Sequence, residues 1–212
     1  MEKVLLINLS PRPKGTSGKL LEYSKEHLGS MYLVKQVNIY KEETEKIIDS
    51  CLESKIIIFI GPCYVNTFPA NTFLLLEKLT MVKEKMSNQL VYAVIQGGMP
   101  YIHTHYSGLQ AVSLFCKECG IEYMGGFVLG GGAMMNGQDF SVLPNGKKVQ
   151  RQFYIFLKKV ADKQYSDEAI YKKVEWRLPV IGWRILARKL NKMLRKQLEE
   201  ARSDEDKKTR IN

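Results

Sequence analysis

The chain contains 212 residues, 45% of them hydrophobic, and has a formal net charge of +10. This length suits one domain of ordinary size with an appendage, or a single larger domain, and the hydrophobic content is typical of a globular protein with a sizeable core. No N-terminal stretch has the features of a signal peptide, and no apolar stretch is long enough to predict a transmembrane helix. Four cysteines in a chain of this length indicate reduced thiols rather than a disulfide framework, so we expect a cytoplasmic protein.

The positive charge is concentrated near the C-terminus. Residues 177–198 contain seven Lys or Arg and no Asp or Glu, whereas the rest of the chain is only mildly basic. This distribution favours one local basic helix over a uniform nucleic-acid-binding surface, so we expect no nucleic-acid partner. We therefore predict a globular domain over residues 1–165 and an extension over residues 166–212, with a basic amphipathic helix from about Gly182 and a frayed terminus.

Two placements of that helix stay open. Its apolar positions recur at intervals of three and four residues, and they are Trp183, Leu186, Leu190, Met193, Leu194 and Leu198. The helix could rest on an anionic membrane surface, or it could pack its apolar face on protein across a dimer. We favour packing, because burial on protein is the commoner fate of such an apolar stripe.

The first twenty residues predict an anion-binding unit. An apolar strand over residues 4–7 leads into a loop rich in small polar residues, and helical periodicity begins at Ser17. Thr16 or Ser17 is placed to cap the helix, whose first free N–H groups favour an anion. The hydroxyls of Ser10, Thr16 and Ser17 would add donors for a phosphate. The loop matches neither glycine-rich nucleotide fingerprint, and an ordinary strand–helix turn is the competing interpretation.

The remaining chain alternates strands and helices. Further strands are predicted over residues 33–40, 56–60, 90–95 and 121–129, and helices over residues 41–53, 71–86, 104–118 and 149–160. This alternation predicts an α/β fold in which helices sandwich a five-stranded parallel sheet of order 2-1-3-4-5. A ligand at its switch point would touch the loops after strands one, three and four, which span residues 10–17, 61–70 and 96–105.

Two of these loops resemble those of the flavodoxin-like NAD(P)H-dependent FMN reductases. The first similar segment is Leu9-Ser10-Pro11-Arg12 with Gly15-Thr16-Ser17, and the second runs from Gly61 to Ala70. The resemblance covers about the first three-quarters of the chain. It implies that Ser10, Arg12, Thr16, Ser17 and Gly18 hold the FMN phosphate. It also implies that Pro62, Cys63, Tyr64, Val65, Asn66 and Phe68 line the isoalloxazine, with Gln96, Gly97 and Gly98 along its other edge.

The chain departs from the reductase pattern at two points. The iron–sulfur branch of that family has a compact cysteine motif before the third strand, where this chain has only Cys51, so we expect no cluster and no metal. Phe68 replaces the usual methionine before Pro69-Ala70, which could alter the mouth of the flavin pocket.

The resemblance implies an oxidoreductase that uses FMN as cofactor and NADH or NADPH as co-substrate. Its electron acceptor would be a small molecule such as a quinone, a nitro compound or a flavin, and the protein would be a homodimer. No side chain is named as strictly catalytic, because the flavin itself performs the chemistry. The alternatives are a flavodoxin-type electron carrier and a flavin-binding module with a membrane-surface tail. His103 and His105 could donate to the flavin or protonate a substrate, although plain loop polarity is the simpler interpretation.

Overall fold

A computed structural model describes residues 1–175 and, beyond them, residues 182, 184, 187–188, 191–192 and 195. The chain forms two compact units, Met1–Trp176 and Arg177–Asn212, and the first contains all the features discussed below. The apolar positions of the predicted C-terminal helix, from Trp183 to Leu198, lie outside the described residues.

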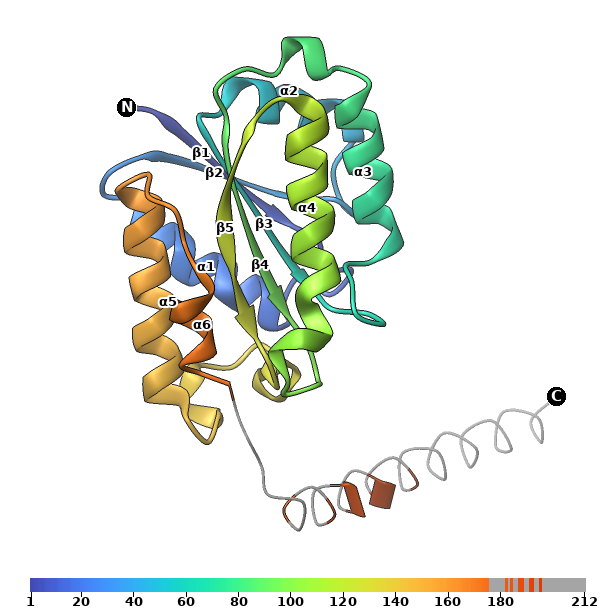
Figure 1. Ribbon diagram of the computed structural model, residues 1–212, viewed down its shortest axis with the longest axis vertical. Coiled ribbons are helices and arrows are strands. Elements are labelled where there is room, and N and C mark those ends of the chain that lie inside the picture. The colour runs from blue at the N-terminus through green and yellow to red at the C-terminus, as the bar shows by residue number, and fades with distance from the viewer. Residues whose placement is uncertain (176–181, 183, 185–186, 189–190, 193–194, 196–212) are drawn as a thin grey trace, which may run out of the picture. The chain divides into compact units, whose positions relative to one another are not determined.

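Five parallel strands form one sheet in the order β2-β1-β3-β4-β5, which confirms the predicted fold class (Figure 1). The strands are β1 (Lys3–Asn8), β2 (Leu33–Asn38), β3 (Ile56–Pro62), β4 (Leu90–Gln96) and β5 (Glu122–Leu129). Every residue of β3 and β4 is buried, as expected for central strands that helices cover on both faces. The first four residues of β2 alternate between exposed and partly buried, because this strand lies at the edge of the sheet.

The helices lie on both faces of this sheet. They are α1 (Thr16–Leu28), α2 (Thr44–Glu53), α3 (Ala70–Thr80), α4 (Tyr106–Cys119), α5 (Gly146–Ala161) and α6 (Glu168–Lys172). α2, α3 and α4 cover one face, and α1 and α5 cover the other (Figure 1). Short 3-10 turns occupy Lys83–Lys85 (η1), Ile102–His105 (η2), Gly132–Met135 (η3) and Phe140–Val142 (η4).

One predicted helix is too long. The expected helix over residues 71–86 ends at Thr80, and the separate turn η1 carries the chain toward β4. Thr80 and Val82 are β-branched residues of low helix propensity, which favours an end at this point. No helix in the described part of the chain is both long and apolar enough to cross a membrane.

The segment after α5 returns to the sheet and packs on β5. Ser166 pairs with Gly125, and the pairing of β4 with β5 shifts register between Val91 and Ala93. Gly125 has a φ of +86°, a left-handed conformation that is typical of a β-bulge. Residues 166–174 thus lie against β5. The division into a domain over residues 1–165 and an extension over residues 166–212 stays a prediction.

Candidate functional site

A pocket lies at the carboxyl ends of β1, β3 and β4. It is lined by Ser10, Arg12, Gly15, Thr16, Pro62, Cys63, Tyr64, Gln96, Gly97, Gly98, Ala133 and Asn136. The sheet order changes direction between β1 and β3, so this is the topological switch point of the fold. Nine of these twelve lining residues belong to the fourteen that the sequence analysis names, and the structure brings their three loops together.

Side chains of two neighbouring strands hold the first loop in place. The N–H of Ser10 donates to Asn8 Oδ1 at 2.9 Å, and Asn38 Nδ2 donates to the carbonyl of Ser10 at 3.1 Å. Within the loop, Ser10 Oγ lies 3.1 Å from both the carbonyl and the N–H of Arg12. The hydroxyl of Ser10 therefore shapes the loop instead of pointing freely into the pocket.

The N-terminus of α1 differs from the sequence expectation. Gly15 occupies the N-cap, and no side chain among the described residues caps this helix, so the proposed capping by Thr16 or Ser17 is wrong. Thr16 Oγ1 instead donates to the carbonyl of Gly132 at 2.9 Å. The first-turn N–H groups therefore have no side-chain acceptor, and the exposed Arg12 lines the same pocket. Together they provide a positive site for an anion.

Ser17 and Gly18 lie behind the lining of the pocket. Ser17 is buried, and its Oγ accepts from Gln96 Nε2 at 3.3 Å. A Cβ at Gly18 would lie 1.8 Å from the carbonyl oxygen of Pro13. Gly18 is therefore required so that the loop can fold closely onto α1, while its side-chain position faces the backbone of the loop.

Cys63, Gly97 and His105 form a closely packed group beside the pocket. A Cβ at Gly97 would lie 2.6 Å from His105 Nε2 and 3.0 Å from the Cβ of Cys63, so only glycine fits there. Cys63 Sγ also contacts the carbonyl of Thr104 at 3.5 Å. Burial raises the pKa of the Cys63 thiol, which favours the neutral, unreactive form.

His105 is fully buried, so its interpretation as plain loop polarity is wrong. Its Nδ1 lies 3.0 Å from the carbonyl of Tyr101, and its Nε2 has no hydrogen-bond partner among the described residues. Burial lowers the pKa of His105, so the imidazole is neutral near pH 7. In the neutral ring, the Nδ1–H group donates to the carbonyl of Tyr101, and this hydrogen bond fixes the position of the turn between β4 and α4.

The loop after β3 forms a tight turn at the edge of the pocket. Tyr64 and Thr67 pair across it, and Val65 and Asn66 between them have φ values of +50° and +70°. Tyr64 lines the pocket, whereas Val65 is 95% exposed. Phe68 is only 2% exposed, and a Cβ at Gly61 would lie 2.9 Å from its ring. Phe68 thus packs in the core below the loop and does not line the pocket.

The turn after β3 yields a stability prediction. A β-branched residue is strained at positive φ, and turns with two such residues prefer Asn and Gly. We therefore expect Val65→Asn to raise the free energy of unfolding by about 1 kcal/mol, as measured by urea denaturation. Val142→Asn is the control, because Val142 is also solvent-exposed, at 42%, but is not at positive φ. An unchanged or lower stability of Val65→Asn would show that the turn is not strained.

The sequence analysis missed three lining residues, Gly15, Ala133 and Asn136. The last two belong to the segment after β5, which begins with three glycines from Gly130. A Cβ at Gly130 would lie 2.2 Å from the carbonyl oxygen of Pro100, so two backbone segments approach closely there. The signal was therefore present: consecutive glycines at the end of a strand indicate close backbone approach.

The described architecture is similar to that of several solved structures. The apo form of an NADH:FMN oxidoreductase matches with a TM-score of 0.62 at 14% identity, covering 81% of this chain and 94% of that chain. An FMN-dependent NADH-azoreductase from Bacillus anthracis str. Ames Ancestor, in complex with FMN, matches with a TM-score of 0.56 at 13% identity. This match covers 76% of this chain and 99% of that chain. A flavodoxin from Streptococcus pneumonia TIGR4 matches with a TM-score of 0.55 at 12% identity, covering 77% of this chain and 99% of that chain.

No protein-family model matches the sequence, and no curated protein does. At 12–14% identity the structural similarity extends to the architecture and not to the chemistry. The strand order, the flanking helices and these matches together show that this chain has the flavodoxin-like fold.

Proposed function

We propose that the protein binds FMN in the pocket at the switch point and is an NAD(P)H-dependent oxidoreductase. The observation that carries this proposal is the composition of the pocket. One end has a positive anion site on α1, and the other has an aromatic residue, Tyr64, and the closely approaching backbone of Gly97 and Gly98. A flavin mononucleotide has the matching parts, which are a phosphate and a flat ring system.

The phosphate would be held at the N-terminus of α1. Arg12 offers a guanidinium, and the N–H groups of the first turn have no competing side-chain cap among the described residues. A Cβ at Gly15 would lie 3.2 Å from the carbonyl oxygen of Arg12, so the glycine lets the loop pack closely at the start of the helix. The hydroxyls of Ser10 and Thr16 already bond to carbonyl groups of the protein, so they support the site and contribute less to the phosphate than the resemblance implies.

The flat ring would lie between Tyr64 and the turn after β4. Gly97 cannot bear a side chain, so backbone rather than side chain faces the pocket at this point. Gln96 also lines the pocket, and its Oε1 is a buried acceptor without a partner in the described part of the chain. A buried acceptor without a hydrogen bond lowers the stability of the protein, and an N–H group of a ligand at this edge could donate to it.

FMN, when bound, supplies the transfer of electrons from NADH or NADPH to a small acceptor such as a quinone, a nitro compound or a flavin. The protein's own residues bind the phosphate, orient the ring and keep one face of the pocket accessible. The names of two structural neighbours, an NADH:FMN oxidoreductase and an FMN-dependent NADH-azoreductase, support this class of reaction. A homodimer, a cytoplasmic location and contact of the extension with a membrane stay predictions.

A flavodoxin-type electron carrier is the second candidate, because a flavodoxin is also among the structural matches. The two candidates differ in turnover. An oxidoreductase consumes NADH or NADPH by itself when a small acceptor is present, whereas a carrier needs a separate reductase.

The full chain, purified and saturated with FMN, is expected to oxidise NADH or NADPH in the presence of a quinone. Tyr64→Ala should weaken FMN binding by about 1–3 kcal/mol, because an aromatic contact is lost, while Tyr64→Phe should retain it. Quenching of flavin fluorescence measures the affinity, and absorbance of the nicotinamide measures turnover. FMN binding without turnover would favour the carrier, and the absence of FMN binding would overturn both candidates.

A further inference from the structure

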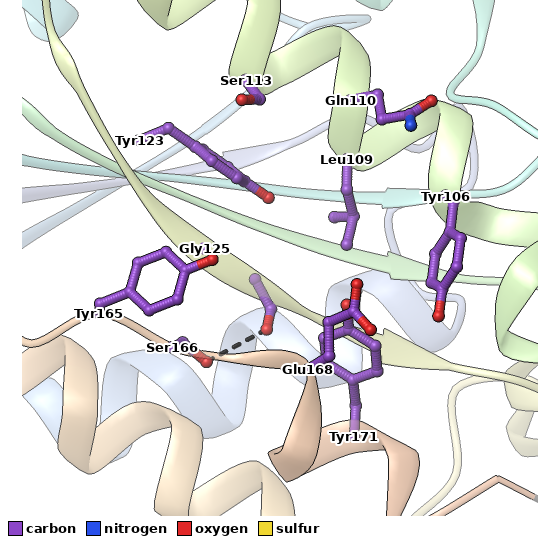
Figure 2. Close-up of a pocket in the computed structure, with 11 residues that line it drawn as sticks. Tyr106, Leu109, Gln110, Ser113, Tyr123, Gly125, Tyr165, Ser166, Glu168 and Tyr171 are labelled. Carbon is purple, nitrogen blue, oxygen red and sulfur yellow. Dashed lines mark hydrogen bonds between the residues drawn. The ribbon is translucent and has the colours of Figure 1, made fainter.

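A second pocket lies beside β5, between α4 and the segment that leads into α6 (Figure 2). It is lined by Tyr106, Leu109, Gln110, Ser113, Tyr123, Gly125, Gly126, Tyr165, Ser166, Glu168 and Tyr171. The described residues that line it do not overlap with those of the first pocket. The proposed function therefore leaves this cavity unused.

The backbone on one side of this cavity is fixed to the sheet. The N–H of Ser166 donates to the carbonyl of Met124 at 2.8 Å, and Ser166 Oγ donates to the carbonyl of Gly126 at 3.2 Å. A Cβ at Gly125 would lie 2.0 Å from the carbonyl oxygen of Ser166, so the two segments are in direct contact. The bulge of β5 and the docked segment make the pocket a built part of the fold.

Four tyrosines and one carboxylate determine the chemistry of this pocket. Figure 2 shows Tyr106, Tyr123, Tyr165 and Tyr171 around it, with Glu168 next to Tyr171. Glu168 is the single formally charged side chain among the described lining residues. An anion would therefore meet a carboxylate and electron-rich rings, which disfavour it.

Tyr171 links these groups electrostatically. It is 3% exposed, and it lines the pocket. Burial raises its pKa most, and the nearby Glu168, Tyr106, Tyr123 and Tyr165 raise it further. Figure 2 shows these residues around the pocket, where their oxygens would accept hydrogen bonds from a cation.

We propose that this pocket binds a small protonated amine that has an apolar or aromatic substituent. The ammonium group would donate to Glu168 and to tyrosine oxygens, and the rings and Leu109 would contact the substituent. Lys172 already pairs with Glu168 from the same helix, although it does not line the pocket. This lysine would therefore compete with the ligand for the carboxylate.

The test uses the full chain and benzylammonium chloride as the probe, with calorimetry as the measurement. Benzyl alcohol, the neutral analogue, is expected to bind much more weakly. Glu168→Gln should weaken binding of benzylammonium by about tenfold or more, since a charge-assisted hydrogen bond is lost. Lys172→Gln should have the opposite effect and strengthen binding several-fold, because the carboxylate loses its competitor.

Glu118→Gln is the matched control, because Glu118 pairs with Lys83 on the exposed surface elsewhere on α4. It should leave the affinity unchanged. Tyr171→Phe should weaken binding without loss of fold, since it removes one hydroxyl from the pocket and keeps the packed ring. No binding of benzylammonium, equal binding of benzyl alcohol, or equal effects of Glu168→Gln and Glu118→Gln would each overturn the proposal.

Discussion

Gly15→Asp is expected to abolish retention of FMN while the protein remains folded. Gly15 is the N-cap of α1 and lines the pocket, with a φ of −82° and a ψ of −168° that any residue can adopt. An aspartate there would place a carboxylate at the first-turn N–H groups, where the phosphate would otherwise bind. Two like charges close together near a protein surface repel by about 3 kcal/mol or more, which is a loss of at least about a hundredfold in affinity.

The stability of the protein separates this effect from misfolding. Aspartate and asparagine are both preferred N-caps, and replacing glycine by either changes helix stability by only a few tenths of a kcal/mol, about the size that N-cap series give. Gly15→Asn is therefore the matched control, with nearly the same size and no charge. We expect it to weaken FMN binding far less than Gly15→Asp. Equal flavin affinity in the wild-type protein and Gly15→Asp would show that the phosphate binds elsewhere.

The sheet could be predicted because its central strands are strongly apolar. β3 and β4 are buried at every position, and their sequences consist mainly of β-branched, aliphatic and aromatic residues. Once five strands alternate with helices, right-handed crossovers leave few possible orders, and the polar character of β2 places it at an edge. Helix ends were less predictable, as the early end of α3 shows, because local packing decides them.

The pocket was predictable only in part because its contacts cross long distances in the sequence. Thr16 was expected to donate to a ligand, but its hydroxyl donates to Gly132, which is 116 residues away. Ser17 likewise bonds to Gln96 instead of capping its own helix. Local patterns identify a residue as a hydrogen-bond donor, whereas the partner depends on which loops the sheet order brings together.

The second pocket had no signal in the sequence. Its tyrosines come from α4, β5 and the segment around α6, and each alone is an ordinary aromatic residue on an amphipathic element. The glycine pair at Gly125 and Gly126 was visible inside a strand, but only the structure shows that Ser166 docks on it. That contact brings the C-terminal tyrosines to β5.

Gly125→Ala is accordingly expected to reduce the free energy of unfolding by about 3 kcal/mol or more. The added methyl would occupy a position 2.0 Å from the carbonyl oxygen of Ser166, and the residue would also keep a φ of +86°. The steric clash and the backbone strain at positive φ therefore add. The clash cannot be relieved easily, because the neighbouring group is backbone and cannot rotate away as a side chain could. Urea denaturation measures the loss, and binding of benzylammonium should be lost together with the docked segment.

Gly120→Ala separates the two costs. Gly120 ends α4 with a φ of +65°, and a Cβ there would have nothing within 4 Å, so only the left-handed backbone is penalised. We expect a loss of about 1 kcal/mol for this variant, the usual cost of a non-glycine residue in that region. The difference between the two variants then measures the steric contact of Gly125 with Ser166. Similar losses in both would mean that the segment after α5 does not dock on β5 as closely as described, and the wall of the second pocket would have to be placed elsewhere.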